Sequence, residues 1–420
     1  MKVCVIGSGG REHALAWRLS ISPSVTKVYA IPGSAAMSDC AELVGIDWQQ
    51  SDHLITFLKD NQVDLVVVGP EAPLVTGLAD VLNKAGIPVF GPSKVAAQLE
   101  GSKVFAKDLM KKYNIPTAAY GVFHKVDEAK EFIGQTGAPI VVKADGLAAG
   151  KGVVVAMTIE EANAAVEDML RGNRFGDAGS TVVIEEFMEG EEASLLAFVD
   201  GKTVVPMIAS QDHKRIFDGD KGPNTGGMGT YAPAPVLTDT LRDEAMKTIL
   251  EPMVAAMQKE GMPYVGCLYA GLMITPQGPK VVEFNARFGD PETQVVLPLL
   301  DSDLGQIMMA CATGTLTADM VKWKDSSAAC VILASKGYPE TSSKGDVIHG
   351  DIKQHDTTIV FHSGTKLIGD EYVTNGGRVL GVVGLGKDLR TALDRAYERI
   401  EHIDFEGMQY RTDIGAKAFK

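Results

Sequence analysis

Three polar side chains alternate along one short apolar stretch, at Glu283, Asn285 and Arg287 within residues 281–294 (VVEFNARFGDPETQ). Alternate side chains of a β-strand share a face, so a carboxylate, an amide oxygen and a guanidinium would lie together. Mg²⁺ accepts such oxygens when phosphates and water complete its shell, and arginine binds anions through a planar fork. The pattern predicts a site for Mg²⁺ and phosphate, and a solvated edge strand is the alternative.

The flanking residues indicate how this strand is placed. Val282, Phe284 and Ala286 are expected on its opposite face, packed against a buried strand at residues 266–274. That partner strand has no carboxylate, so these strands alone do not predict a second metal ion. A Gly-Asp-Pro-Glu turn follows and adds the carboxylates of Asp290 and Glu292.

A glycine-rich stretch at residues 143–155 (KADGLAAGKGVVV) carries lysine but is not a Walker loop. A Walker loop has Ser or Thr after Gly-Lys and opens a helix. Here Gly150 and Lys151 are followed by Gly152 and by three valines, which favour a strand. The pattern predicts a glycine-rich, lysine-bearing loop between two strands.

The N-terminal sequence GSGGREH resembles a dinucleotide fingerprint only in part. Glu12 stands where the third glycine belongs, and the second predicted strand, ending at residues 29–33, has no acidic residue for a ribose. NAD binding is therefore not expected. The turn at Gly9 and Gly10, with Arg11 beside it, still offers a helix N-terminus to a phosphate. A tight turn that needs glycine for packing is the alternative.

Two further stretches carry weaker signals. Residues 182–192 (VVIEEFMEGEE) form a strand that leaves its sheet through a connector, whose backbone could read a purine while Glu192 binds a ribose. Residues 212–229 combine basic side chains with a glycine-rich end, which suits close approach to a substrate. An ordinary acidic loop and a mobile surface loop are the respective alternatives.

The elements that must position these residues alternate along the chain. Strands and helices alternate over residues 1–100, which predicts a parallel sheet with helices on its faces. A helix is expected over residues 93–115, strands dominate from 191 to about 325, and short strands and one closing helix follow. The predicted domains are residues 1–102, residues 103–325 with a small unit at about 122–190, and residues 326–420.

The composition limits the classes of partner. The 420 residues are 45% hydrophobic and 22% charged, as in ordinary globular proteins, with a net charge of −14. The negative charge argues against nucleic acid as a partner, and no apolar run is long enough for a membrane helix. Five widely spaced cysteines read as reduced, mostly buried thiols. A cytoplasmic location is expected.

Together these motifs resemble the ATP-grasp superfamily and, within it, the phosphoribosylamine–glycine ligase family. The segments GSGGREHA, GPEAPL, KADGLAAGKGV, GPNTGGMG, YAGLM and RFGDPETQ stand in matching order over essentially the whole chain. The resemblance implies an α/β fold, α+β in its ATP-grasp part. It also implies an N-terminal parallel-sheet domain, an ATP-grasp centre with a small mobile lid closing on ATP, and a strand-rich C-terminal domain.

The resemblance also implies residue roles. ATP contacts are expected from Lys103, Lys143, Gly150, Lys151, Gly152, Glu185, Glu186, Phe187, Met188 and Glu192. Substrate contacts are expected from Gly9, Gly10, Arg11, Glu71, Thr225, Gly226, Gly227 and Met228. Glu283 and Asn285 would hold Mg²⁺ or Mn²⁺, and Arg287, Asp290 and Asp212 would act in catalysis.

The implied reaction joins glycine to 5-phosphoribosylamine, with ATP as co-substrate and a glycyl phosphate as intermediate. Its partners would be small molecules only, and a monofunctional monomer is expected. Two rival functions stay open: another ATP-grasp ligase or carboxylase of nucleotide metabolism, acting for example on bicarbonate, and a non-catalytic nucleotide-binding protein.

Overall fold

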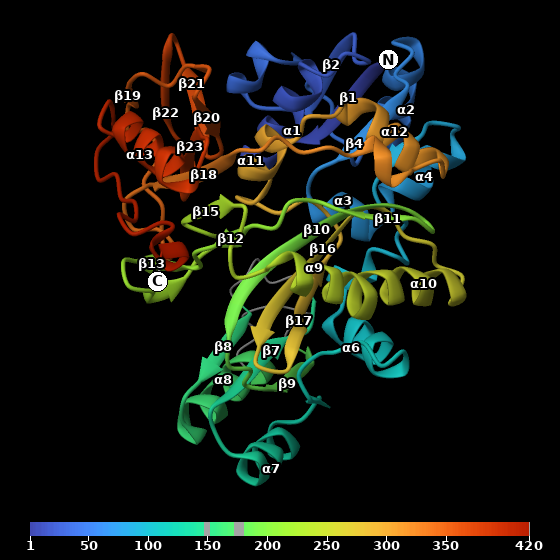
Figure 1. Cartoon of the computed structure of the whole chain (residues 1–420), viewed down its shortest axis with the longest axis vertical. Helices are drawn as coiled ribbons and strands as arrows, with labels where there is room; N and C mark the ends of the chain where they lie inside the picture. Colours follow the sequence, from blue (N-terminus) through green and yellow to red (C-terminus); the bar gives the residue numbers. More distant parts are fainter. Residues whose placement is uncertain (147–151, 172–179, 420) are drawn as a thin grey trace.

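The computed structural model describes residues 1–146, 152–171 and 180–419, and its N-terminal part holds a parallel sheet (Figure 1). Neighbouring strands follow the order β3 (Glu42–Leu43), β2 (Lys27–Pro32), β1 (Lys2–Gly7), β4 (Leu65–Val68) and β5 (Val89–Phe90). The helices of this part are α1 (Gly10–Ser20), α2 (Ser51–Asp60), α3 (Glu71–Thr76) and α4 (Leu78–Lys84). The predicted parallel-sheet organisation is confirmed.

The strand order reverses between β1 and β4, because β2 and β3 extend the sheet on one side and β4 and β5 on the other. Ligands of open α/β sheets bind at such a point, beyond the carboxyl ends of the strands. Gly7 ends β1 and Gly69 follows β4, so this crevice lies beside the N-terminal turn at Gly9.

The helical stretch predicted over residues 93–115 contains two helices with a break between them. α5 (Gln98–Gly101) ends before Ser102, whose backbone is extended, and α6 (Lys103–Lys112) begins after it. The Ser102 hydroxyl accepts a hydrogen bond from the Phe105 N–H at 3.1 Å. Ser102 therefore acts as the N-cap of a new helix.

A small antiparallel sheet forms its own unit near the bottom of Figure 1. Its strands follow the order β6 (Tyr120–Phe123), β9 (Val182–Glu186), β7 (Ile140–Ala144) and β8 (Val153–Ala156), with α7 (Val126–Thr136) and α8 (Ile159–Arg171) packed on it. Ile133, Val142, Val166 and Ile184 belong to a separate apolar core of this unit. The predicted glycine-rich connection thus joins two antiparallel strands, although its residues 147–151 lie outside the described part.

The central sheet is antiparallel and carries the polar face predicted from the sequence. Its order is β11 (Val204–Pro206), β10 (Glu191–Asp200), β16 (Val265–Thr275) and β17 (Gly278–Asn285). The expectation that strands dominate this region missed several helices. They are α9 (Asp239–Ala245), the π-helical turn η3 (Met246–Leu250), α10 (Glu251–Lys259), α11 (Thr293–Val296) and α12 (Leu304–Thr313).

Residues 212–229, where the sequence suggested a loop, contain short strands. A hairpin of β13 (Arg215–Phe217) and β14 (Lys221–Asn224) lies between β12 (Gln211–Asp212) and β15 (Gly229–Ala232). β15 pairs with β18 (Ser327–Ala334), so the C-terminal sheet draws strands from both sides of the proposed boundary near residue 325. The domain limits therefore stay a proposal.

The C-terminal part is rich in strands, as predicted. Its main sheet follows the order β12, β15, β18, β23 (Arg378–Gly386) and β20 (Thr358–His362), and α13 (Leu389–Ile400) packs on β23 and β18. The shorter strands are β19 (His349–Gly350), β21 (Thr365–Ile368), β22 (Glu371–Thr374) and β24 (Ile403–Asp404). Short 3₁₀ turns are η1 (Ala35–Asp39), η4 (Leu297–Leu299), η5 (Ala318–Met320) and η6 (Ala416–Phe419).

Two bulk features complete the fold. Within residues 1–146, 152–171 and 180–419, no helix combines the length and apolar character that a membrane crossing requires. All five cysteines are free thiols, of which Cys40 is the one that is partly exposed. The cysteines thus contribute to packing as small apolar side chains.

Candidate active site

A cavity of about 980 Å³ lies where the parts of the chain meet. Its walls come from β17 of the central sheet, β7 and β9 of the small sheet, α6, and the segment from β12 to β14. Arg11 and Glu71 reach it from the N-terminal part, and Arg378 and Lys417 reach it from the C-terminal part. The cavity therefore has walls from all three predicted domains.

The predicted polar face of β17 opens into this cavity. Glu283, Asn285 and Arg287 line it, and so does part of Phe284, but Phe284 and Ala286 are only 3% and 1% exposed. The burial of these five residues alternates as the sequence predicted.

The alternation fails one residue earlier, at Val282, which was predicted to face the core. The register with β16 shifts between Gly271, opposite Glu283, and Leu272, opposite Val281. Val282 is therefore a bulge residue, and it lines the cavity. Its carbonyl accepts a hydrogen bond from Lys143 Nζ at 3.1 Å.

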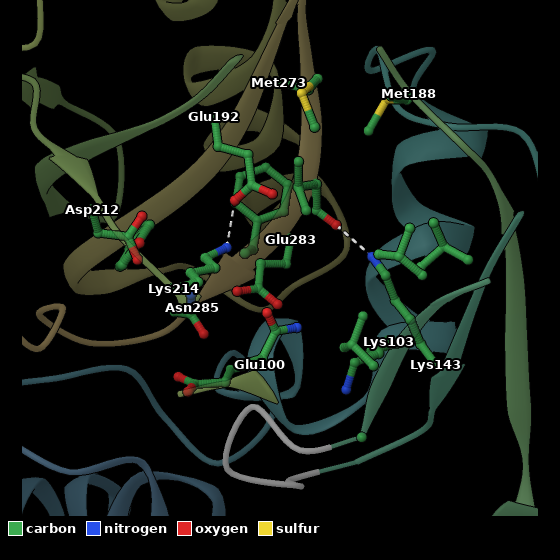
Figure 2. Close-up of a pocket in the computed structure, with 18 of the residues that line it drawn as sticks. Glu100, Lys103, Lys143, Met188, Glu192, Asp212, Lys214, Met273, Glu283 and Asn285 are labelled. Atoms are coloured by element: carbon green, nitrogen blue, oxygen red, sulfur yellow. Dashed lines mark hydrogen bonds and ion pairs between the residues drawn. The ribbon is translucent and has the colours of Figure 1, made fainter. Parts of the chain in front are cut away.

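Glu283 lies between cations from separate elements (Figure 2). Burial raises its pKa, but Lys214, Lys143 and Lys103 outweigh burial and lower the pKa below its ordinary value. Figure 2 shows Lys103 and Lys143 on one side of Glu283 and Lys214 with Glu192 on the other. The site thus holds an ionised carboxylate, and the lysines around it can still bind an anionic ligand.

Arg287 is held by two carboxylates. Its NH2 lies 2.9 Å from Glu100 Oε1, and its Nε lies 3.3 Å from Glu71 Oε2. Burial raises the pKa of Glu100, whose other oxygen accepts the Ala286 N–H at 2.8 Å. Glu100 was not identified from the sequence, because its partners are nearly 200 positions away. Its position at the end of α5 fixes the direction of Arg287.

A buried group of two lysines and one glutamate lies toward the small sheet. Lys143 Nζ and Lys107 Nζ approach the same Glu185 Oε2, at 3.0 and 3.1 Å. Glu185 Oε1 is buried without a hydrogen-bond partner among the described residues. Burial lowers the pKa of Lys107, which the sequence did not indicate, to about 8. An unpartnered buried oxygen is expected to find a donor on a bound ligand.

The connector after β9 forms the next part of the wall. Glu186, Phe187, Met188 and Glu192 all line the cavity, as expected for a nucleotide-binding connector. Glu192 Oε2 lies 2.5 Å from Lys214 Nζ. A ribose hydroxyl at Glu192 would therefore compete with this ion pair or share it.

Lys103 lies at the start of α6, beside the small sheet. Its Nζ donates to the Gly146 carbonyl at 3.0 Å, and its backbone N–H donates to Asp145 Oδ1 at 2.6 Å. Burial lowers the pKa of Lys103. Gly152 also lines the cavity. The predicted ATP contacts Gly150 and Lys151 lie outside the described residues.

The predicted glycine end of the site contains Asp212, Asp290, Thr225 and Gly226, all of which line the cavity. Burial raises the pKa of Asp212 to about 7, with Lys214 opposing the shift and nearby Glu292 adding to it. Burial also acts on Asp290, but Arg378, Arg11 and Gln294 together lower the pKa of that carboxyl. Two carboxyl groups of one site thus differ in protonation behaviour.

Gly227 and Met228 are not brought to the cavity. Met228 is completely buried in a small apolar cluster with Ile216 and Ala334. Its N–H donates to the His213 carbonyl, and its carbonyl accepts from the Ile332 N–H. A Cβ on Gly227 would lie 2.6 Å from Pro291 Cδ, which indicates packing. These contacts favour a packing role for Met228, and its substrate contact stays a prediction.

Gly9 and Gly10 are also absent from the cavity wall, although Arg11 belongs to it. The Gly9 N–H donates to Glu12 Oε2 at 2.8 Å, and Arg11 Nε donates to Glu12 Oε1 at 2.6 Å. A Cβ on Gly10 would collide with Ser363 Oγ and lie 2.9 Å from Gln294 Nε2. These contacts favour the packing alternative, and the phosphate role of Gly9 and Gly10 stays a prediction.

Lys214 and Arg378 are the main site residues that sequence reasoning missed. Lys214 stands two positions after Asp212, so strand alternation could have placed both on one face. Arg378 NH1 donates to the carbonyls of Gly226 and Asp290 at 2.9 and 2.8 Å, and NH2 lies 3.4 Å from Asp290 Oδ2. A single arginine before an apolar strand gave no comparable signal.

Family models match almost the whole chain. Residues 1–100 match the N domain of phosphoribosylglycinamide synthetase, residues 101–293 match its ATP-grasp (A) domain, and residues 328–417 match its C domain.

Individual relatives agree with the family models. A phosphoribosylamine–glycine ligase of Halalkalibacterium halodurans is 53% identical over 418 residues, covering 100% of this chain and 97% of the relative. One of Neisseria meningitidis is 53% identical over 421 residues, covering 100% and 99%.

Solved structures show the same fold. A phosphoribosylamine–glycine ligase of Thermotoga maritima superposes with a TM-score of 0.86 at 34% identity, covering 99% of this chain and 100% of that one. The biotin carboxylase domain of a Hydrogenobacter thermophilus 2-oxoglutarate carboxylase gives a TM-score of 0.75 at 16% identity, covering 97% and 91%. At that identity the second likeness concerns the fold alone.

Proposed function

This chain belongs to the phosphoribosylglycinamide synthetase family, and we propose on this premise that its cavity joins glycine to 5-phosphoribosylamine. ATP is the co-substrate of this ligase, and the products are glycinamide ribonucleotide, ADP and phosphate, in purine biosynthesis. The observation that carries the assignment to this cavity is the cluster around Glu283, where lysines from three elements surround one ionised carboxylate.

ATP is assigned to the side of the cavity between the small sheet and β17. Lys103 and Lys143 supply positive charge for its phosphates, and Glu192 lies in reach of its sugar. The unpartnered Oε1 of Glu185 can accept a hydrogen bond from the base, next to the connector from Glu186 to Met188. Closure of the small sheet as a lid, which would exclude water from a reactive acyl phosphate, belongs to the same proposal.

The donor set of β17 fits Mg²⁺ or Mn²⁺. Glu283 and Asn285 offer one carboxylate and one amide oxygen, both on the cavity wall. No group of three or more His, Cys, Asp or Glu able to hold a metal occurs among the described residues. This agrees with an ion that takes few protein ligands and completes its shell with phosphates and water. When bound, the ion would neutralise charge on the phosphates.

The proposed first step forms a bond between a carboxylate oxygen of glycine and the γ-phosphorus of ATP. The bond from that phosphorus to the β–γ bridging oxygen breaks, and ADP leaves. Arg287 lies on the cavity wall where a guanidinium could stabilise the transferring group. Its ion pairs with Glu71 and Glu100 hold it in place, so it is positioned before substrates bind.

The proposed second step forms the amide. The ribosylamine nitrogen attacks the carbonyl carbon of glycyl phosphate, the bond from that carbon to the phosphate oxygen breaks, and phosphate leaves. The nitrogen loses one proton, which Asp212 can accept because burial raises its pKa to about 7. Arg11 and Glu71, on the N-terminal side of the cavity, are assigned to the ribosylamine.

A three-substrate assay tests the proposed function against its rivals. ADP release is measured with glycine and fresh 5-phosphoribosylamine, with either one omitted, and with bicarbonate replacing glycine. We expect ADP and glycinamide ribonucleotide in equal amounts only when both substrates are present. ADP release driven by bicarbonate would indicate a carboxylase, and nucleotide binding without turnover in any arm would indicate a binding protein.

The remaining expectations concern state and location. We infer a monomer acting on small molecules in the cytoplasm.

A further inference from the structure

The β13–β14 hairpin carries part of the cavity wall but has little support of its own. Arg215, Asp220 and Asn224 of the hairpin, and Lys214 just before it, line the cavity. Among the described residues, its two strands pair only with each other, and residues 217–223 are exposed. An isolated two-stranded ribbon is marginally stable in water, so contacts outside the hairpin must fix its position.

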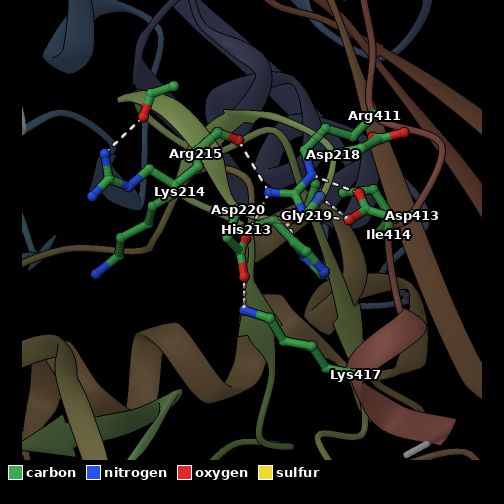
Figure 3. Close-up of polar contacts among 12 residues, drawn as sticks. His213, Lys214, Arg215, Asp218, Gly219, Asp220, Arg411, Asp413, Ile414 and Lys417 are labelled. Carbon is green, nitrogen blue, oxygen red and sulfur yellow. Dashed lines mark hydrogen bonds and ion pairs between the residues drawn. The ribbon is translucent and has the colours of Figure 1, made fainter. Parts of the chain in front are cut away.

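Arg411, from the segment after β24, supplies the central contact (Figure 3). Its side chain is 1% exposed. Nε and NH2 bind the two oxygens of Asp413 at 2.7 and 2.8 Å. NH1 donates to Asp220 Oδ1 at 2.8 Å and to the Arg215 carbonyl at 3.1 Å. One guanidinium therefore joins the C-terminal segment to the start of β13 and to the turn of the hairpin.

The neighbours of Arg411 hold the turn of the hairpin. Asp413 Oδ2 also accepts the Gly219 N–H at 2.8 Å. The Thr412 N–H donates to Asp218 Oδ1 at 2.9 Å, and Lys417 Nζ lies 2.8 Å from Asp220 Oδ2. All three residues of the turn are thus bound by residues 412–417.

A buried histidine fixes the start of the hairpin region in the same way. His213 is 1% exposed, its Nδ1 lies 3.3 Å from the Gly229 carbonyl, and its Nε2 lies 3.3 Å from the Gly415 nitrogen. A carbonyl requires a donor at Nδ1, so Nε2 is the acceptor for the Gly415 N–H. Burial, then Arg411 and Lys417, lower the pKa of His213 to about 4, which agrees with this neutral form.

We propose that Arg411 and Asp413 are positioning residues for the ligase reaction. They hold the Arg215 carbonyl and the hairpin turn, and so keep the preceding residue, Lys214, directed at the cavity. Lys214 Nζ binds Glu192, and Lys214 lines the cavity. Neither Arg411 nor Asp413 lines the cavity, so both act through Lys214. The inference rests on the proposed function for its kinetic consequence.

A double-mutant cycle separates positioning from simple stabilisation. Arg411→Lys keeps the charge but loses the fork that binds two carboxylates. We expect it to lower kcat/KM for the three-substrate reaction about tenfold in the parent. In a Lys214→Met background, where there is no ammonium to position, the same change should cost less than about twofold. Equal losses in both backgrounds would overturn the positioning role.

Arg399→Lys is the matched control. Arg399 also lies in the C-terminal part, is 10% exposed, and binds an aspartate (Asp351 Oδ2, 2.6 Å) and a carbonyl (Lys353, 2.8 Å), but it does not contact the hairpin. We expect Arg399→Lys to change Tm by a similar amount and to leave kcat/KM within about twofold. An equal kinetic loss in this control would assign the effect of Arg411→Lys to stability.

Hydrogen exchange tests the contact without turnover, so it remains informative if the proposed function fails. Amides of residues 215–224 should exchange at least about tenfold faster in Arg411→Lys than in the parent or in Arg399→Lys. Asp413→Asn, which keeps the shape of the acceptor, should give the same pattern if Arg411→Lys does not fold. Unchanged exchange in the hairpin would overturn the proposal, whereas a parent without glycine-dependent ADP release would contradict the proposed function alone.

Discussion

The turn after β1 and the face of β17 both place polar groups at the end of an apolar strand, and their polar groups have different partners. After β1, Glu12 fills the space between the strand ends. A Cβ on Gly7 would lie 2.5 Å from Glu12 Cγ, and one on Gly69 would collide with its carboxylate. Both glycines make room for this side chain, whose oxygens bind Gly9 and Arg11.

On β17 the partners come from distant parts of the chain and leave a cavity between them. The lysines around Glu283 belong to α6, β7 and the residue before β13. A local motif whose polar groups bind within its own turn can serve the fold without a ligand. A motif whose charge is balanced only by distant elements around an open volume is better suited to bind a ligand.

The largest expected effect is at β17. Glu283→Gln keeps the shape but removes the charge that Mg²⁺ requires, so turnover should fall at least about a hundredfold, or about 2.7 kcal/mol of barrier. Tm should stay within about 5 °C of the parent, as measured by thermal unfolding. Glu244→Gln, which changes an exposed glutamate near the start of β17, serves as the control. A folded Glu283→Gln variant with more than about a tenth of the parent turnover would contradict the proposal that Glu283 binds the metal ion.

The second effect is at the N-terminal turn and should be one of stability. Gly10→Val places atoms against Ser363 Oγ and Gln294 Nε2, and such overpacking costs about 1–3 kcal/mol. We expect a lower Tm and parallel losses of ADP and product affinity. Gly45→Ala is the control, because a Cβ there meets nothing within 4 Å. If Gly10→Val instead weakened only product binding at unchanged Tm, the turn would be a phosphate site and the comparison would fail.

The smallest effect concerns the pH dependence of stability at Asp212. Burial raises its pKa from an ordinary 3.8 to about 7, so the folded state keeps a proton that the unfolded state has released. This contribution to stability is lost as pH rises from about 4 to about 7. Urea unfolding at pH 5 and pH 8 should show Asp212→Asn gaining stability relative to the parent as pH rises.

A matched control for the pH experiment is Asp319→Asn. A hydrogen bond with Thr317 lowers the pKa of this exposed carboxyl, so it does not titrate between pH 5 and pH 8. Its stability relative to the parent should be the same at pH 5 and pH 8. If Asp212→Asn behaved in the same way, the pKa of Asp212 would not be raised, and its carboxylate would be a weaker base for the proton of the second step.

Sequence reasoning could predict what depends on local pattern. Strand alternation placed Glu283, Asn285 and Arg287 on one face, and the alternation of strands and helices predicted the parallel sheet. The bulge at Val282 could not be predicted, because it arises from pairing with β16. Lys107 approaches Glu185 only through tertiary packing, so spacing along the chain gave no signal for it.

Other omissions had signals that were present in the sequence. The Asp-Gly-Asp turn at residues 218–220, between short strand-forming segments, is a typical hairpin signal. Ile249, Met253 and Met257 recur at helical spacing and are buried, as in an amphipathic helix. The expectation that strands dominate the region took precedence over the hairpin signal and the helical spacing, because each of these local patterns is weak.

Transfer of oxygen from glycine to phosphate tests the glycyl phosphate route directly. The enzyme turns over glycine labelled with ¹⁸O in both carboxylate oxygens, together with ATP and 5-phosphoribosylamine, and the released phosphate is analysed by mass spectrometry. If the carboxylate attacks the γ-phosphorus in this cavity, each phosphate carries one ¹⁸O and the amide of the product retains the other. Phosphate without label, released while glycinamide ribonucleotide forms, would contradict the glycyl phosphate route.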